Sequence, residues 1–307
     1  MPKKIIFMGT SFFAVPILKS LYQNGYPISV VYTQPPQKSL RGQKINKSPI
    51  QGISETLNID FRFPQTLRDN DEEYNFLKEL NADLAIVVAY GQIIPKRFLN
   101  LTKKGFVNIH GSILPKWRGA APIQRSIMNS DTETGISIMK INEELDAGPI
   151  MHQAKINMNQ NMDANTLSEI LSKLGAKNLI VAIDQIENKE IKFKEQKHSN
   201  ASYAKKISKH EGKIEWNESA KKILAKINGL TPNPGAWFEY KGERYKVWKA
   251  KILESKGKIG FTINNELTIA CKENSIQILE IQKEGKSKLS LEKFLLGNQI
   301  KIGENII

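Results

Sequence analysis

The chain has 307 residues, 40% of them hydrophobic and 25% charged, and a formal net charge of +14. This length exceeds that of one typical domain and suits two, each with its own core. No apolar run approaches the roughly 20 residues that cross a bilayer, and the N-terminus lacks the apolar region and cleavage site of a signal peptide. We therefore predict a two-domain, cytoplasmic protein without a transmembrane helix, and we expect a monomer.

The positive charge is distributed unevenly along the chain. Residues 1–189 carry 22 basic and 17 acidic side chains, whereas residues 190–307 carry 23 and 14. Such an excess favours a polyanion, although a general bias towards lysine produces the same count, so charge alone leaves both interpretations open. The single cysteine, Cys271, excludes an intrachain disulfide and is expected to be a buried, inert thiol. Neither a cysteine cluster nor a paired His-x-x-x-His spacing indicates a zinc site.

Strand and helix patterns alternate along the first part of the chain. Strands are predicted at 4–9, 28–32, 84–89 and 105–110, and helices at 12–25 and 71–80. Alternation of this kind is typical of a parallel sheet, so we predict a doubly wound, Rossmann-like α/β domain. The turn at Gly9-Thr10-Ser11 lacks the Gly-x-Gly-x-x-Gly and Gly-Lys-Ser/Thr patterns, and we interpret it as a structural turn rather than a nucleotide site.

A second domain is predicted after a polar linker. An amphipathic helix over 166–187 closes the first domain, 1–189, and the segment 190–208 has little apolar periodicity. In the remainder, 209–307, a helix over 220–229 precedes a series of short strands. These strands are predicted at 236–240, 244–252, 259–263, 267–270 and 276–282. We predict that this basic domain is a small, OB-like β-barrel.

Two short polar motifs carry the chemistry. Asn108-Ile-His110-Gly-Ser-Ile-Leu-Pro ends a predicted strand, and Glu-Leu-Asp146-Ala-Gly-Pro follows after one more strand. Asn donates to an oxyanion, neutral His exchanges protons near pH 7, and Asp orients the imidazole and accepts from an ammonium. These groups suffice to transfer an acyl group to an amine through a tetrahedral intermediate. An isolated His is more often a core residue, and Asp146 alone is compatible with a simple turn.

In these motifs and several others, the chain closely resembles the methionyl-tRNA formyltransferase family. The match runs from end to end and rests on Gly9-Thr10, Val88-Ala-Tyr-Gly-Gln-Ile-Ile-Pro95, Asn108-Ile-His-Gly-Ser-Ile-Leu-Pro115, Arg118-Gly-Ala-Ala-Pro-Ile-Gln124, Thr134-Gly-Ile-Ser137 and Leu145-Asp-Ala-Gly-Pro149. The resemblance implies transfer of a formyl group from 10-formyltetrahydrofolate to the methionine amine of initiator methionyl-tRNA, for translation initiation. It implies Asn108, His110 and Asp146 as catalytic residues and no metal.

The resemblance also implies binding residues. Those expected at the folate are Val88, Ala89, Tyr90, Gly91, Gln92, Ile93, Ser112, Leu114 and Pro115. A simple strand-end turn is the alternative for the first six. Within the basic loop 33–49, Arg41, Gly42 and Lys44 fall on the family's Arg-Gly-x-Lys pattern for the tRNA acceptor stem, with Gln43 where a lysine is common. Arg118 and Gly119 are expected to steer the anionic substrate, with a solvated surface arginine as the alternative.

Two other functions remain as alternatives. The Asn-x-His-x-Ser-x-Leu-Pro core resembles the wider folate-dependent formyltransferases, so a sugar nucleotide or another small amine is a possible acceptor. The basic loop and basic C-terminal domain favour tRNA, because a small acceptor needs neither. A catalytically inert tRNA-binding protein is the second alternative, against which the complete catalytic set argues. Trp237 and Trp248 are expected in the core rather than stacked on bases. His152, His198 and His210 receive no assignment.

Overall fold

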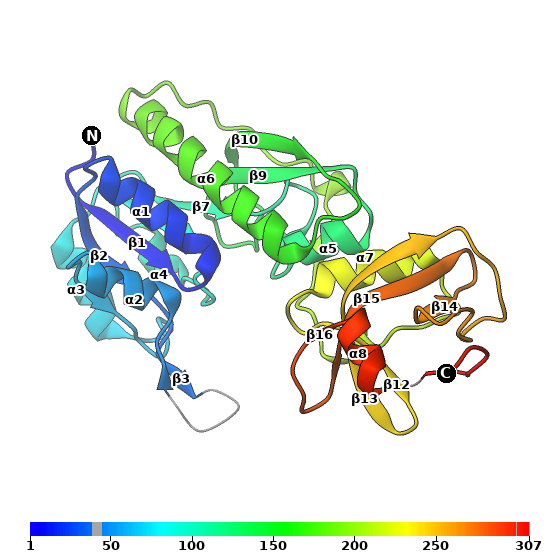
Figure 1. Ribbon diagram of the computed structural model, residues 1–307. Helices are drawn as coiled ribbons and strands as arrows, with labels where there is room; N and C mark the ends of the chain where they lie inside the picture. Colours follow the sequence, from blue (N-terminus) through cyan, green and yellow to red (C-terminus); the bar gives the residue numbers. More distant parts are fainter. Residues whose placement is uncertain (39–44, 299, 307) are drawn as a thin grey trace. The chain divides into compact units, whose positions relative to one another are not determined.

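The structure is a computed structural model that describes residues 1–38, 45–298 and 300–306 (Figure 1). The chain forms two compact units, and neither is a continuous stretch of sequence. Unit 1 comprises residues 1–119, 134–156 and 168–203, and unit 2 comprises 120–133, 157–167 and 204–307. The domain limits predicted from the sequence, 1–189 and 209–307, stay a proposal about how the chain divides into domains. Among the described helices, none has the length and apolar character needed to cross a membrane.

Unit 1 is built on a seven-stranded sheet with the order β10-β9-β7-β6-β1-β2-β5. Its strands are β1 (Ile5–Gly9), β2 (Ile28–Tyr32), β5 (Phe61–Arg62), β6 (Leu84–Val88), β7 (Phe106–His110), β9 (Glu133–Lys140) and β10 (Ile150–Asn157). Five of them, β5, β2, β1, β6 and β7, run parallel, and β9 pairs antiparallel with β7. All five residues of β1 are buried, as in a strand covered on both faces. The predicted doubly wound, Rossmann-like fold is confirmed.

Helices cover both faces of this sheet (Figure 1). They are η1 (Phe12–Ala14), α1 (Val15–Gln23), α2 (Pro49–Thr56), α3 (Asp71–Leu80), α4 (Lys96–Leu99) and α6 (Ala164–Glu187). On one face, Leu77 of α3 and Phe98 of α4 share a core cluster with Ile6 of β1. Elsewhere α6 approaches β7 closely, since a Cβ added at Gly175 would lie 3.1 Å from the Ile109 side chain. The apolar periodicity of these helices is thus explained by contact with the sheet.

The strand order reverses between β1 and β6, and the loops after these two strands are joined. Thr10 Oγ1 donates to the Tyr90 carbonyl at 2.7 Å and accepts from the Gln34 amide at 3.2 Å. Packing requires a glycine at position 9, because a Cβ there would lie 2.8 Å from the Phe7 side chain and 2.9 Å from that of Ala14. Open α/β sheets bind ligands at such a switch point, outside the carboxyl ends of the strands. The fold therefore places the expected site where ligands of this architecture bind.

The basic loop 33–49 begins and ends as an antiparallel hairpin. Its strands are β3 (Gln37–Lys38) and β4 (Ile45–Asn46). At the base of the loop, Thr33 Oγ1 and Ser48 Oγ lie 2.6 Å apart, and Ser48 also caps α2 by accepting from the main-chain N–H of Gln51. Arg41, Gly42 and Lys44, expected at the tRNA, lie outside the described residues.

Unit 2 combines helices with an antiparallel sheet. Its helices are α5 (Pro122–Met128), η3 (His210–Gly212), α7 (Ala220–Leu230) and α8 (Leu291–Gly297), and its strands are β12 (Ala236–Tyr240), β13 (Glu243–Leu253), β14 (Thr268–Ala270), β15 (Ser275–Lys283) and β16 (Leu289–Ser290). The sheet order is β12-β13-β15-β14, with β16 also on β15. Gly229 of α7 permits close packing on α5, because a Cβ there would lie 2.6 Å from Met128 Cγ. The predicted small, OB-like β-barrel is confirmed as a domain of antiparallel strands that curl into a half-barrel.

Two details of this domain differ from the sequence prediction. Residues 259–263 do not form a strand, because Gly260 adopts φ 78° and the segment makes only isolated bridges, from Phe261 to Asn305 and from Thr262 to Ile269. The core assignment of Trp237 and Trp248 is also wrong. Both side chains are half-buried on the opposite face of the sheet from the buried Phe238 and Val247. Each tryptophan is adjacent in sequence to one of these buried residues, and successive side chains of a strand point to opposite faces.

Candidate active site

The end of β7 brings the three predicted catalytic side chains together. Asn108 Nδ2 lies 3.5 Å from Asp146 Oδ1, and His110 Nδ1 lies 3.5 Å from Asp146 Oδ2. Asn108 and His110 alternate with Ile109 on the strand and so face the same carboxylate, as their spacing predicted. The side chains of His110 and Asp146 are 6% and 14% exposed. Long contacts of this kind are usual in sites without substrate, where hydrogen bonds tighten only in the reacting complex.

The second ring nitrogen of His110 has a fixed partner. His110 Nε2 lies 2.8 Å from the Trp117 carbonyl oxygen. A carbonyl can only accept, so we assign the Nε2 proton to this bond. The Nδ1 side of the ring then faces Asp146 and is free to exchange a proton there. The Trp117 carbonyl is a functional group that the sequence motif gave no reason to single out.

The carboxylate of Asp146 is also held by the main chain. The Gly119 amide donates to Asp146 Oδ2 at 2.8 Å. Gly119 lies in β8 (Arg118–Gly119) and adopts φ 117°, while Trp117 and Asp146 adopt φ 65° and 50°. Non-glycine residues in the left-handed region cost of order 1–3 kcal/mol and persist where the surroundings hold them. The Gly119 amide therefore contacts the cluster of Asn108, His110 and Asp146, and the expected contact of Gly119 with the substrate stays a prediction.

Arg118 is not the surface residue that a substrate-steering role requires. Its side chain is 2% exposed, and its Nε and NH2 atoms donate to Gln196 Oε1 at 3.1 and 2.8 Å. The NH1 group lies 3.5 Å from His198 Nδ1, in the short helix η2 (His198–Asn200). The predicted contact with the anionic substrate is corrected, because the guanidinium is buried against protein acceptors. Both partners belong to the segment that we interpreted as a linker.

The loop between His110 and Arg118 is held by hydrogen bonds to β9. Ser112 Oγ donates to the Lys116 carbonyl at 2.6 Å, Leu114 N donates to Ser137 Oγ at 3.0 Å, and Ser137 Oγ donates to the Ser112 carbonyl at 2.7 Å. Ser112 and Leu114 are 0% and 2% exposed. Their side chains therefore shape the loop, whereas Pro115, the third residue expected at the folate here, is half-buried.

The other expected folate segment follows β6. Val88 is buried in the strand, Ala89 and Gly91 are exposed with φ 46° and 85°, and Ile93 is 81% exposed. Tyr90 is 2% exposed, and burial raises the pKa of its phenol well above the usual range. The Gln92 side chain donates to the Pro64 carbonyl at 2.9 Å and accepts from Leu67 N at 3.1 Å. The segment thus presents backbone and one apolar side chain at the switch point.

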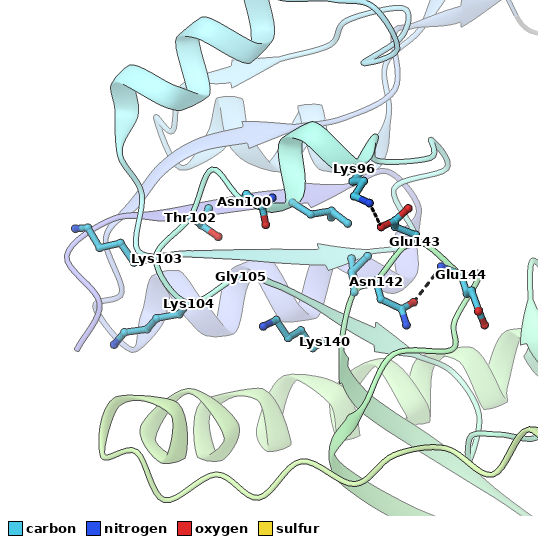
Figure 2. A pocket seen from close by; sticks show the side chains of 12 residues that line it. Lys96, Asn100, Thr102, Lys103, Lys104, Gly105, Lys140, Asn142, Glu143 and Glu144 are labelled. Atoms are coloured by element: carbon cyan, nitrogen blue, oxygen red, sulfur yellow. Dashed lines mark hydrogen bonds and ion pairs between the residues drawn. The ribbon is translucent and has the colours of Figure 1, made fainter.

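A pocket of about 760 Å³ lies at the amino end of β7 and contains none of the predicted site residues (Figure 2). Its lining is Lys96, Leu99, Asn100, Thr102, Lys103, Lys104, Gly105, Lys140, Ile141, Asn142, Glu143 and Glu144. Figure 2 shows Lys96 directed at Glu143, 2.7 Å away. Lys103 pairs with Asp83 at 2.8 Å, and Lys104 pairs with Glu187. Because these pairs balance most of the positive charge, we assign the pocket no ligand.

The remaining reactive side chains have ordinary structural environments. Cys271 is buried, and burial raises the pKa of its thiol to about 12, as expected for an inert cysteine. His152 Nε2 lies 2.7 Å from Asn178 Oδ1. Within residues 1–38, 45–298 and 300–306, no group of three or more His, Cys, Asp or Glu side chains is arranged to hold a metal ion.

Comparison with known families accounts for both units. The family model described as "Formyl transferase" matches residues 3–183, and that described as "Formyl transferase, C-terminal domain" matches residues 206–299. Together with the Rossmann-like fold and the Asn108, His110 and Asp146 cluster, these matches define an enzyme of the formyl transferase class.

Individual relatives narrow the class. The methionyl-tRNA formyltransferase of Pelagibacter ubique (strain HTCC1062) is 57% identical over 100% of this chain and 99% of its own. That of Chelativorans sp. (strain BNC1) is 39% identical over the whole length of both chains. The chain belongs to the methionyl-tRNA formyltransferase family.

Solved structures of lower sequence identity share the fold. The N-formyltransferase from Helicobacter canadensis, in complex with folinic acid and dTDP-3-aminofucose, gives a TM-score of 0.69 at 20% identity over 91% of this chain and 99% of its own. HypX from Aquifex aeolicus, in complex with tetrahydrofolic acid, gives 0.67 at 17% identity over 98% of this chain and 50% of its own.

Proposed function

We propose that this enzyme transfers the formyl group of 10-formyltetrahydrofolate to the methionine amino group of initiator methionyl-tRNA, as a monomer in the cytoplasm, for translation initiation. The observation that carries the proposal is the Asn108, His110 and Asp146 cluster within a chain 57% identical, end to end, to a methionyl-tRNA formyltransferase. The sugar N-formyltransferase is similar only at 20% identity, which supports the shared fold and not the acceptor.

The cluster offers a group for each charge that develops. When an amine attacks a formyl carbon, negative charge grows on the formyl oxygen and positive charge on the nitrogen. Asn108 has a second Nδ2–H, beyond the one directed at Asp146, to donate to that oxygen. His110 Nδ1 and Asp146 Oδ2 take the proton from the amine, while Nε2 stays bonded to Trp117. 10-Formyltetrahydrofolate supplies the formyl group, and tetrahydrofolate leaves with a proton on the nitrogen that carried this group.

The switch point between β1 and β6 fits a flat, partly apolar ring system. Phe12, in η1 after β1, and Ile93, in the loop after β6, are each 81% exposed and offer apolar surface to such a ring system. The loops are tied together by the bond from Thr10 to the Tyr90 carbonyl. Ala89 and Gly91 supply exposed backbone beside them. We therefore assign the pterin to this segment, with backbone groups setting its orientation.

The outer face of the unit 2 sheet supports a nucleic-acid partner. We define this outer face by Trp237, Arg244, Lys246, Trp248 and Lys288. The Arg244 guanidinium lies 3.9 Å from the Trp237 ring centroid, and Lys246 and Lys288 lie 4.1 and 5.4 Å from that of Trp248. Cations beside aromatic rings are the usual composition of surfaces that bind nucleic-acid backbones and bases. We propose contact with tRNA at this face and at Arg41, Gly42 and Lys44.

Formyl transfer to different acceptors tests the proposal. The assay uses 10-formyltetrahydrofolate with charged initiator tRNA, charged elongator methionine tRNA, free methionine and a dTDP-amino sugar, for the wild type and His110→Ala. We expect formylation of the initiator tRNA alone and its loss in the variant. Transfer to the amino sugar without transfer to any tRNA would assign the enzyme to the small-amine branch. Tight tRNA binding with no donor turnover would indicate an inert binding protein.

A further inference from the structure

A buried glutamine in the predicted linker binds both loops that surround His110. Gln196 is 6% exposed, although the residues on either side of it are exposed and polar. Its Nε2 group donates to the Asp146 carbonyl at 2.9 Å and to the Gly148 carbonyl at 2.8 Å. Its Oε1 atom accepts both bonds from Arg118. One amide thus uses all of its donors and its acceptor to join the Asp146 loop to the Arg118 loop.

The same segment holds a second part of the Arg118 loop. Ser202 Oγ accepts from Trp117 N at 3.0 Å, and the Ser202 carbonyl accepts from Arg118 N at 2.8 Å. Residues 196–202 therefore fix Trp117 and Asp146, which are the two residues that contact the ring nitrogens of His110. Both have positive φ, a conformation that non-glycine residues keep only where surrounding contacts hold it.

We propose that Gln196 is a positioning residue for formyl transfer. By bonding the main chain at Asp146 and the side chain of Arg118, it sets the carboxylate against His110 Nδ1 and the Gly119 amide against that carboxylate. Catalysis by positioned proton-transfer groups is sensitive to such placement, since a 1 Å error costs about 10²-fold. The inference rests on the proposed function for its kinetic part, and its structural part is independent of any substrate.

Two substitutions remove different hydrogen bonds of this amide. Gln196→Met keeps the length of the side chain but neither donates nor accepts, whereas Gln196→Glu keeps an acceptor for Arg118 and loses the donors to the Asp146 and Gly148 carbonyls. We expect kcat to fall about 10- to 100-fold in both variants, with KM for tRNA and folate within about twofold. The pH profile of kcat in Gln196→Met should approach that of Asp146→Asn, and the variant that carries both substitutions should lose little more activity than Asp146→Asn alone.

The matched control is Gln277→Met. Gln277 is 5% exposed in unit 2 and donates to Glu266 Oε2, so its removal tests the loss of a buried amide in the unit that does not contain His110. We expect a lower Tm with unchanged kcat. If Gln196→Met behaves in the same way, or if Gln196→Glu retains wild-type kcat, the amide serves only the stability of the fold and the proposal is wrong.

Hydrogen exchange tests the inference without substrate. The Gly119 amide donates to Asp146 Oδ2, so it should exchange several-fold faster in Gln196→Met than in Gln277→Met when both are compared with the wild type. Unchanged exchange at Gly119 would overturn the positioning role even if activity fell. Absence of formyl transfer in the wild type would refute the proposed function alone, and the exchange result would still decide the role of Gln196.

Discussion

The cluster of Asn108, His110 and Asp146 in unit 1 and the outer face of unit 2 use polar side chains in opposite ways. In the cluster His110 is 6% exposed, and protein groups contact both of its ring nitrogens and the Asp146 carboxylate. On the outer face the Arg244 side chain is 47% exposed and touches only a ring and a weak ion-pair partner, Glu239, 3.7 Å away. Buried networks fix geometry, whereas exposed cations exchange partners easily. Changes in the first should therefore alter turnover, and changes in the second should alter binding.

Removing the proton-transfer pair should give the largest effect. We expect His110→Ala to lower kcat about 10²- to 10⁴-fold with little change in tRNA affinity, because positioned acid–base groups contribute that much. His110→Ala and Asp146→Ala should be non-additive, since they serve one proton transfer. Kinetics of the two single variants and the double variant measure this, and independent multiplicative losses would show separate roles.

The oxyanion donor should rank next. Asn108→Ala is expected to lower turnover about 10²- to 10³-fold, the usual cost of one lost donor, while tRNA binding in a filter assay stays unchanged. Asn108→Asp has a similar size and is the matched test, because it removes the N–H groups and adds negative charge. Near-normal turnover in Asn108→Ala would remove Asn108 from the oxyanion site.

The outer face should respond in binding alone. Arg244→Ala is expected to raise Kd for initiator tRNA several-fold and to reduce the slope of log Kd against log salt concentration by about 0.7–0.9, the value for one phosphate contact. At saturating tRNA, kcat should match the wild type. The control is Lys222→Ala, which removes an exposed lysine of α7 that pairs with Glu218. A salt slope unchanged in Arg244→Ala would contradict phosphate contact at this residue.

The smallest effect concerns a charge pair that belongs to neither region. Hydrogen bonds from Arg125 hold the pKa of the Glu211 carboxyl below its usual value. A lowered folded-state pKa adds stability above the unfolded value, near 4.3, and this stability is lost as pH falls through the folded pKa. Between pH 7 and 3.5, Tm of the wild type should therefore fall more than Tm of Glu211→Gln. The corresponding difference in the free energy of unfolding should be at most about 1 kcal/mol, and Glu218→Gln should change the pH dependence less.

The sequence predicted the parts whose signal is local. β1 and β7 follow from contiguous apolar runs, and the catalytic cluster follows from Asn108 and His110 being two apart on one strand with Asp146 in a second short motif. The face of the sheet on which Trp237 and Trp248 lie also follows from a local rule, the alternation of side chains along a strand. The core prediction was wrong because it relied instead on the preference of aromatic residues for cores. Parity along the strand was the better guide.

The sequence did not predict contacts made over long distances along the chain. Gln196 bonds residues 78 and 50 positions away, in a polar stretch without periodicity, so nothing near it indicates burial. The burial of Arg118 depends on the same contact and was missed for the same reason. The predicted strand over 259–263 failed because its bonding is irregular: Phe261 and Ile263 bond to residues of β14, whereas Thr262 bonds to Glu304 in a turn. Such facts require the tertiary structure.

The discontinuous composition of unit 2 has a consequence for how the protein is made and divided. α5 belongs to unit 2 and packs on α7, although residues 134–156 and 168–203 of unit 1 lie between them in the sequence. A nascent chain therefore exposes α5 long before the ribosome has synthesised its partner, so completion of this unit has to wait for the end of translation. For the same reason, a fragment cut at residue 189 or 208 would retain α5 without α7, and loss of activity in such a fragment would report a broken unit rather than a missing tRNA contact.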